Sequence, residues 1–249
     1  MSKKRPECLQ SHALNVPWVQ ILKGKRVVLA SASPRRREIL EIFGLNPEIV
    51  PSTFEENLGL SQFDDLHEYP VATANFKAVE VYRRLVEQDP EDPPDLVIAA
   101  DTVVLTYPQP ILSSTPDSEL LGFRPDVLEK PVSRDDNLRM LLDLNGNRCE
   151  VVTGVSIVYP VLESPGYKIH SMDDRTLVTF SDNPVSLLNA YADSGEGIDR
   201  AGGFAVQGLG GMLVRKIEGD FRNVVGFPAA AFFKTLEILL EEEPDFLTI

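Results

Sequence analysis

The chain has 249 residues, of which 43% are hydrophobic and 25% are charged, so it is long enough to bury a sizeable core as one α/β domain. It carries 24 Lys and Arg against 38 Asp and Glu, a formal net charge of −14, which disfavours non-specific binding to nucleic acid or to a membrane surface. A polyanionic ligand would therefore be held by a few cations placed locally, helped by a metal ion that acidic groups bind.

The Cys and His residues indicate a reducing compartment and no structural zinc. Cys8 and Cys149 form no C-x-x-C motif, and the three histidines (His12, His67 and His170) stand too far apart for zinc-like spacing. No apolar region follows the basic start, and no apolar run approaches the ~20 residues needed to cross a bilayer. We therefore expect a cytoplasmic protein without membrane or nucleic-acid partners.

The first predicted elements are an extension followed by a strand, a turn and a helix. Residues 1–24 are expected to be a loosely ordered extension in which Trp18 could dock on the body, and residues 25–249 to form a single domain. The apolar run Arg26–Ala30 is typical of a buried strand. Ser33 then suits the N-cap of a helix, with Pro34 in the first position and a glycine near its end.

The start of this helix is a candidate anion site. Free backbone N–H groups and the positive end of the helix dipole attract anions there. Ser31 adds a hydroxyl group, and Arg35 and Arg36 add cations where the dipole disfavours positive charge unless an anion binds. The alternative is that Arg35, Arg36 and Arg37 simply form a solvated helix start.

The middle of the chain alternates strands and helices less strictly. We predict a mixed twisted β-sheet flanked by helices, with no internal repeat. The expected elements are a strand at 48–51, a helix at 71–86, a strand at 96–104, a helix that Ser133 caps, strands at 151–159 and 176–180, a helix at about 184–191, a strand within 210–217 and a closing helix after Pro228. Residues 107–126, rich in Pro, Ser and Asp, are expected to be a surface insertion.

Several charged residues stand out in this frame. Asp101 interrupts an apolar strand, where a carboxylate is costly unless it is paired or binds a metal ion. It could be satisfied structurally, but such groups are enriched at functional sites. Glu56, after another strand, could offer an oxygen ligand to a divalent cation. Lys77 and Lys130 are individually ordinary surface lysines.

The segment 199–211, DRAGGFAVQGLGG, is the other unusual stretch. Its glycines allow close backbone approach, and Gln207 is an amide that could recognise a base edge. A tight glycine-rich hairpin without a ligand is the alternative.

Several short motifs in one order resemble the Maf family of nucleotide pyrophosphatases. They are LASASPRR (29–36), FEE (54–56), ANFKA (74–78), ADT (100–102), EKP (129–131), GFAVQG (203–208) and FRNVVGFP (221–228). The resemblance covers nearly the whole chain from Val27 to the closing helix. It implies an inosine-triphosphatase-like fold with a cleft between two lobes.

The resemblance also implies an activity: hydrolysis of the α–β phosphoanhydride of a nucleoside triphosphate with Mg²⁺ or Mn²⁺. The family's proton acceptor falls on Asp101. Its other active-site positions fall on Ser31, Arg36, Glu56, Lys77 and Lys130, and the metal ligands would be Glu56 and Asp101. A homodimer is compatible with these features.

Three positions divide the family by substrate, and they carry Arg35, Thr102 and Gln207 here. This set resembles the dTTP/UTP branch and not the 7-methyl-GTP branch. Two departures are the 107–126 insertion and Arg200, where the family has a lysine.

Two other functions stay open at this point. One is a nucleotide-binding regulator of cell division without significant turnover, and the other is a purine-type house-cleaning triphosphatase. Release of pyrophosphate separates the first from an enzyme, and purine preference marks the second.

Overall fold

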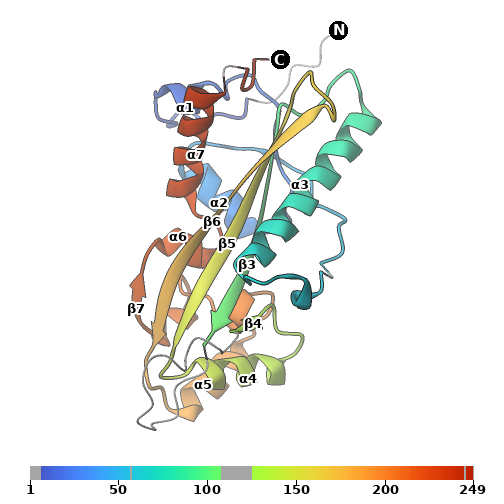
Figure 1. Cartoon of the computed structure of the whole chain (residues 1–249). Coiled ribbons are helices and arrows are strands. Elements are labelled where there is room, and N and C mark those ends of the chain that lie inside the picture. The colour runs from blue at the N-terminus through green and yellow to red at the C-terminus, as the bar shows by residue number, and fades with distance from the viewer. Residues whose placement is uncertain (1–6, 57, 108–124, 244, 249) are drawn as a thin grey trace. The chain divides into compact units, whose positions relative to one another are not determined.

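A seven-stranded mixed sheet organises the structure, a computed structural model that describes residues 7–56, 58–107, 125–243 and 245–248 (Figure 1). The strand order is β2-β1-β3-β5-β6-β7, with β4 paired to β3. β1 runs parallel to β2 and β3, whereas β4 is antiparallel to β3 and β7 to β6. The strands are β1 (Val27–Leu29), β2 (Glu48–Ile49), β3 (Leu96–Thr106), β4 (Asp126–Leu128), β5 (Arg148–Pro160), β6 (Tyr167–Phe180) and β7 (Val214–Glu218).

Helices lie between several of these strands along the chain, so the predicted mixed sheet flanked by helices is confirmed. The α-helices are α1 (Pro17–Gln20), α2 (Pro34–Ile42), α3 (Glu68–Gln88), α4 (Arg134–Leu144), α5 (Val185–Ser194), α6 (Phe221–Val225) and α7 (Ala229–Glu242). Short 3-10 turns are η1 (Leu60–Gln62), η3 (Ala201–Gly203) and η4 (Leu209–Met212). None of the helices in the described part of the chain combines the length and apolarity needed to cross a bilayer.

The chain forms two compact units. The first unit comprises the residues up to Asp101, Thr153–Asp174 and the residues from Gly226 onward, and the second comprises Thr102–Val152 and Arg175–Val225. Strands β3, β5 and β6 each contribute residues to both units. The assignment of 25–249 to one domain stays a prediction.

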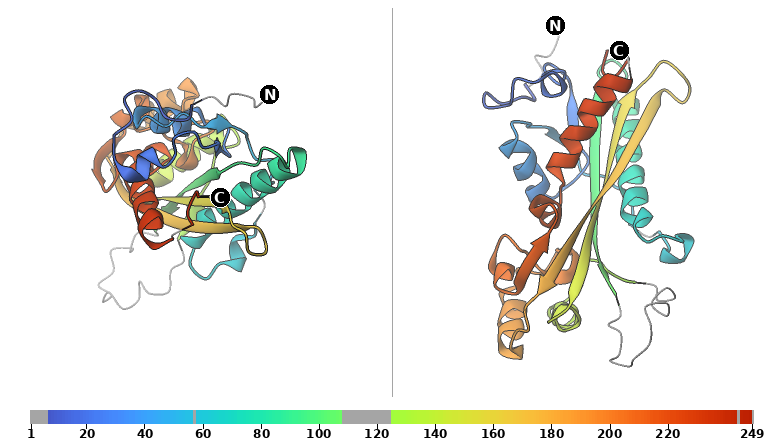
Figure 2. Two further views of the ribbon diagram at one scale, coloured as in Figure 1. Left: turned by 90° about the horizontal axis from the view of Figure 1, so that it is seen from above. Right: turned by 60° about the vertical axis from the view of Figure 1, so that its left-hand side comes forward.

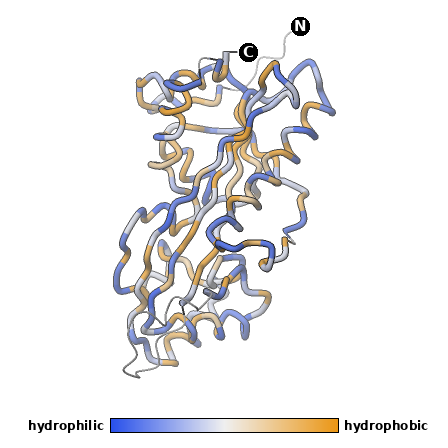
Figure 3. The backbone as a smooth tube through the Cα atoms, viewed as in Figure 1, coloured by the Kyte–Doolittle hydropathy of each residue, from blue (hydrophilic) through white to orange (hydrophobic). Residues whose placement is uncertain are grey.

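The first unit places helices on both faces of its strands. Helix α3 lies on one face, and α2 and α7 lie on the other (Figure 2). Apolar residues recur along α3 between hydrophilic ones (Figure 3), and its inner face packs Ala78, Val81 and Leu85 against Val28 and Val97. These residues recur at helical spacing, as expected for the buried face of the helix predicted at 71–86.

A close approach of backbones fixes α3 on β5. A Cβ atom at Gly154 would lie 2.4 Å from the backbone nitrogen of Val71 and 2.5 Å from the carbonyl carbon of Pro70. Only glycine leaves room for this contact. The start of α3 is thereby held at a defined position on the strand.

The second unit has its own core. Met140, Leu141 and Leu144 of α4 pack there with Leu188 and Tyr191 of α5. Ser133 accepts a hydrogen bond from the backbone N–H of Asp136 (3.1 Å), which confirms it as the N-cap of α4.

The prediction that residues 1–24 are loosely ordered is wrong for residues 7–24. Cys8, Val19 and Leu22 are buried, and the Cys8 thiol donates to the Leu22 carbonyl (2.8 Å). Helix α1 packs against α7, and Leu9 bridges to Leu45. Apolar side chains without periodic spacing give no local signal, yet they bury readily against the body. Residues 1–6 lie outside the described residues.

The strands depart most from the prediction at β6 and β4. β6 begins at Tyr167 and not at 176. Its first half is mostly polar and contains no buried residue, so it shows no apolar pattern that predicts a strand. Residues 126–128 form β4, which pairs with β3. The last residue of the predicted 107–126 insertion, Asp126, therefore belongs to a strand. Residues 108–124 of that insertion lie outside the described residues.

Candidate active site

The start of α2 brings Ser31 and Arg36 together. Buried β1 leads directly into Ser31, whose hydroxyl oxygen accepts from the backbone N–H of Ser33 (3.2 Å). Arg36 points back along the helix: Nη1 donates to Ser31 Oγ (3.2 Å) and Nε donates to the Gly226 carbonyl (2.9 Å). Ser33 occupies the N-cap position but makes no side-chain capping bond. The guanidinium group is therefore held beside the helix N-terminus, where an anion is favoured.

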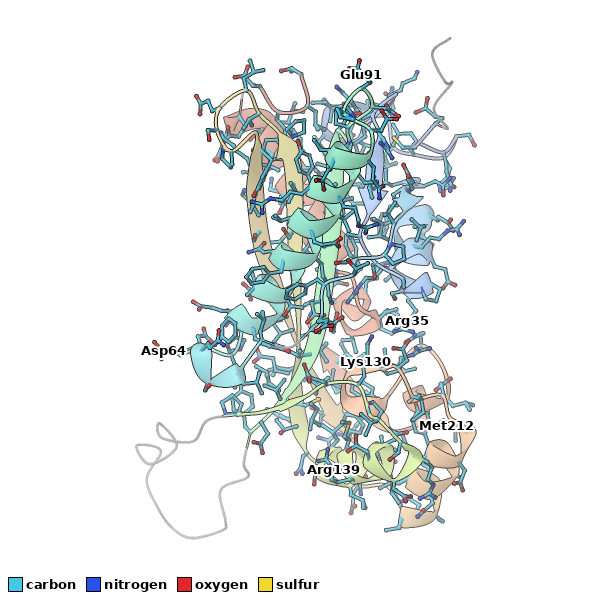
Figure 4. The ribbon with its side chains drawn as sticks, turned by 90° about the vertical axis from the view of Figure 1, so that its right-hand side faces the viewer. Arg35, Asp64, Glu91, Lys130, Arg139 and Met212 are labelled. Carbon is cyan, nitrogen blue, oxygen red and sulfur yellow. The ribbon has the colours of Figure 1, made fainter. Side chains whose placement is uncertain are left out.

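The two neighbouring arginines differ from each other. Arg35 lies half-buried in the first turn of α2 (Figure 4). Arg37 is exposed, and its Nε donates to Glu41 (2.7 Å) in an i,i+4 pair on the surface. Arg37 thus has the ordinary role of a solvated helix residue.

Lys77 joins two carboxylates from different elements. Its Nζ donates to Asp101 Oδ1 on β3 (2.8 Å) and lies 2.7 Å from Glu56 Oε1, in the loop after β2. Lys77 and Asp101 are both buried, whereas 43% of the Glu56 side chain is exposed. The structure therefore brings together three of the predicted catalytic residues, and Lys77 is not the surface lysine that its sequence context suggested.

Burial and charge act in opposite directions on Asp101. Burial raises the pKa of its carboxyl group, whereas the positive charges of Lys77 and Arg36 lower it, and the net direction is upward. The Glu56 carboxylate adds to the rise. A carboxylate with a raised pKa is a better proton acceptor, which suits general-base chemistry.

The loop that carries Glu56 is fastened to α3. Glu80 accepts from the Ser52 hydroxyl (2.7 Å) and from both the hydroxyl (3.0 Å) and the backbone N–H (3.1 Å) of Thr53. Nearby, the rings of Phe54 and Phe76 stack 5.1 Å apart. Phe76 immediately precedes Lys77, so the stack and Glu80 hold the loop beside the lysine.

The second unit contains the other predicted residues. Lys130, labelled in Figure 4, follows β4 and forms an ion pair with Asp199 (3.0 Å) that is largely exposed. Asp199 has a positive φ of 62°, which is uncommon outside glycine. Thr102 is half-buried on β3, next to Asp101 in the chain, and Gln207 is exposed in the glycine-rich loop.

The carboxylates of the first unit fit a divalent cation that binds with its substrate. Glu56 and Asp101 converge on one ammonium group and offer the oxygen ligands that Mg²⁺ prefers. Across the described residues, no three His, Cys, Asp or Glu side chains form a group that could hold a metal ion. Mg²⁺ commonly takes one or two carboxylates and completes its shell with water and substrate phosphates, which matches this donor set.

Two carboxylates that sequence reasoning missed organise the loops around these residues. Glu80 accepts hydrogen bonds from the loop that carries Glu56, and Glu196 accepts hydrogen bonds from the glycine-rich loop. Glu80 lies three residues after Lys77, so it falls on the same side of the helix, and this spacing is a signal that could have found it. Glu196 lies 13 and 14 residues from its partners and gave no comparable signal.

Comparisons with known proteins agree with this arrangement. The chain is 44% identical over 227 residues to a human protein named probable bifunctional dTTP/UTP pyrophosphatase/methyltransferase, covering 88% of this chain but only 33% of the human protein. It is 38% identical over 244 residues to the dTTP/UTP pyrophosphatase of Schizosaccharomyces pombe, covering 95% and 93% of the two chains. A protein of the same name from Clostridium perfringens is 38% identical over 213 residues, which cover 85% of this chain and 96% of that protein.

A family model described as Maf-like protein matches residues 26–239, which include the α2 start, Glu56, Lys77 and Asp101. Both the family match and the relatives extend over most of the chain, as the order of the short motifs predicted. The chain belongs to the Maf family.

Proposed function

We propose that this protein is a nucleoside triphosphate pyrophosphatase that hydrolyses dTTP and UTP to the monophosphate and pyrophosphate. The names of the relatives support this substrate class. The observation that carries the proposal is the buried pair of Lys77 and Asp101 with Glu56 beside it and Arg36 in electrostatic contact.

Asp101 is the proton acceptor in this proposal. Its carboxylate takes a proton from the water that attacks the α-phosphorus, and the bond from that phosphorus to the α–β bridging oxygen breaks. Burial raises the pKa of Asp101, which favours uptake of the proton. Glu56, the second carboxylate at the Lys77 ammonium group, orients that lysine.

The cations act mainly by position and charge. Arg35, Arg36 and Ser31 hold the triphosphate at the start of α2, and Lys77 and Lys130 stabilise the negative charge that develops on the leaving pyrophosphate. A divalent cation, when bound at Glu56 and Asp101, supplies further neutralisation of the phosphates. Arg35, Thr102 and Gln207 select the base.

The test is release of pyrophosphate from a panel of ordinary and modified triphosphates in the presence of Mg²⁺ or Mn²⁺. The expected result is preference for dTTP and UTP, with monophosphate and pyrophosphate as products. Binding without release of pyrophosphate over hours would support a regulator instead, and preference for purines would support a house-cleaning triphosphatase.

Asp101→Asn is the matched variant for this assay, since it keeps the size of the side chain and removes its basicity. We expect its kcat to fall by roughly 10²–10⁴-fold, the usual contribution of a general base. Circular dichroism and thermal unfolding check that it stays folded. Full turnover by a folded Asp101→Asn protein would remove Asp101 from the mechanism.

A further inference from the structure

The glycine-rich segment 203–211 is fixed by two side chains that the proposed mechanism does not use. Tyr191 lies in α5 and Glu196 follows that helix, both in the second unit. Both bond to the backbone of the segment on either side of Gln207. This arrangement constrains the one exposed amide to which we assign recognition of the base.

Tyr191 anchors the segment before Gln207. Its ring is 4% exposed, and its hydroxyl oxygen accepts from the backbone N–H of Ala205 (2.9 Å). The hydroxyl group also helps to lower the pKa of the Glu196 carboxyl group, so the two anchoring side chains influence each other.

Glu196 anchors the segment after Gln207. Oε1 accepts from the backbone N–H of Leu209 (3.0 Å) and Oε2 from that of Gly210 (3.0 Å). A Cβ atom at position 208 would lie 2.1 Å from Oε1, so glycine is needed for the carboxylate to come this close. Although burial opposes it, these bonds bring the pKa of Glu196 below its ordinary value, and the group is ionised at neutral pH.

Gln207 occupies the turn between the two anchors. The backbone N–H of Gly208 donates to the Ala205 carbonyl (3.0 Å), which closes a four-residue turn with Val206 and Gln207 in its centre. The following turn, η4, continues to Met212, which Figure 4 labels. The backbone around Gln207 is thus held by Tyr191, Glu196 and its own turn, while its side chain is exposed.

We propose that Glu196 and Tyr191 are positioning residues that fix the placement of Gln207 and so determine which base the enzyme accepts. The inference rests on the proposed function, in which Gln207 recognises the base. Thymine and uracil present an N–H donor between two carbonyl oxygens, which an amide matches with its own carbonyl and NH₂ groups. Cytosine instead presents an acceptor, its ring nitrogen N3, beside a donor, its exocyclic amine. An amide can satisfy either base by turning over, so selection requires that its position and approach be constrained.

The experiment compares kcat/KM for dTTP and dCTP in the wild type, Glu196→Gln, Tyr191→Phe and Gln207→Ala. Glu196→Gln keeps the shape but sets an NH₂ donor against a backbone N–H, and Tyr191→Phe removes the hydroxyl link. Both are expected to lower the dTTP:dCTP ratio by roughly tenfold, mainly through KM for dTTP, the scale of one lost hydrogen bond to a charged group. Glu218→Gln, on the surface strand β7, is the matched control and should keep the ratio.

The double variant Glu196→Gln/Gln207→Ala separates positioning from general damage. If Glu196 acts through Gln207, the double variant should show the same ratio as Gln207→Ala alone. A Glu196→Gln protein that retains the wild-type ratio, or a Gln207→Ala protein that does so, overturns the inference.

Amide hydrogen exchange without nucleotide gives a readout independent of activity. Exchange in residues 205–211 should accelerate in Glu196→Gln, with rates in α4 unchanged. A wild type without preference for dTTP contradicts the proposed function. The exchange data then still decide whether Glu196 fixes the loop: acceleration supports that part, and unchanged rates overturn it.

Discussion

Lys77 places a positive charge directly on buried Asp101, through an ion pair in which Nζ lies 2.8 Å from Oδ1. Taking a carboxylate out of water costs several kcal/mol unless a partner compensates for the lost hydration. The ammonium group provides that compensation from α3 and at the same time reaches the half-exposed Glu56. One side chain therefore serves both the stability of the first unit and the chemistry proposed for it.

Replacing Lys77 with Met should destabilise the protein in a pH-dependent way. The pKa of Asp101 is already raised in the folded state by burial, and Lys77 is the largest influence that lowers it. A carboxyl group with a raised folded-state pKa favours folding below its unfolded pKa, and this contribution is lost as the pH rises through the folded pKa. Removing the ammonium group of Lys77 raises the pKa of Asp101 further, so more stability is lost when the pH rises.

We expect Lys77→Met to be less stable than the wild type by about 3–5 kcal/mol at pH 8, the usual cost of breaking a buried pair. The difference should shrink as the pH is lowered to 5, because a carboxyl group with a raised pKa takes up a proton more readily and then needs no cation beside it. Urea unfolding at both pH values measures it, and exposed Lys23→Met provides the control. A destabilisation that is equal at both pH values would show that lost packing, and not the charge, dominates.

At the scale of elements, the loop after β2 owes its position to α3. Glu80 holds Ser52 and Thr53 and is itself bonded by Arg84 Nε (2.7 Å), one turn further along the helix. Burial of Glu80 raises the pKa of its carboxyl group, but the hydrogen bonds from Arg84 and from the loop outweigh burial, so the pKa lies below its ordinary value. The carboxylate is therefore charged when it holds the loop.

Glu80→Gln should lower activity without touching the reacting groups. An amide cannot accept all the bonds that the carboxylate accepts, so the Glu56 loop should loosen. We expect kcat/KM to fall by roughly tenfold and stability by about 1–2 kcal/mol. The control is Glu87→Gln, an exposed glutamate at the end of the same helix. Equal losses of kcat/KM in both variants would assign the effect to charge on α3 and not to the loop.

Gly154→Ala tests the contact between β5 and the start of α3. The added methyl group would meet the backbone of Pro70 and Val71 at 2.4–2.6 Å, and backbone atoms cannot rotate away as a side chain can. We expect destabilisation by about 1–3 kcal/mol, as for overpacked sites, measured by thermal unfolding. Gly59→Ala, which faces mainly the end of the Gln62 side chain, should change stability by less than about 0.5 kcal/mol. A Gly154→Ala protein as stable as Gly59→Ala would contradict the close packing.

For the whole molecule, the net charge of −14 opposes binding of a triphosphate. Because the two carboxylates of the first unit suit a cation that arrives with substrate, removal of metal should abolish activity but leave the fold intact. We expect EDTA to eliminate pyrophosphate release, excess Mg²⁺ or Mn²⁺ to restore it, and the Tm to change by less than about 1 °C. A large fall in Tm on chelation would reveal a permanently bound structural ion.

The sequence by itself determined the features that depend on local spacing. The inner face of α3, with Ala74, Ala78 and Val81, follows from helical periodicity, and the capping bond of Ser133 from its place before the helix. The family and the proposed activity follow from short motifs in a fixed order. In α7 several apolar spacings fit one helix, so local spacing alone does not decide the inner face: Ala230 is exposed, whereas Phe232 is buried.

Only the tertiary structure decided how residues from separate elements meet. In the folded chain Lys77 is buried, and its ammonium group contacts both Asp101 and Glu56. Glu196 accepts hydrogen bonds from backbone N–H groups 13 and 14 residues away. Residues 7–24 pack against the body. The physical reason is that periodicity and capping act within a few residues, whereas desolvation, ion pairing and long-range hydrogen bonds depend on which surfaces the whole chain brings into contact.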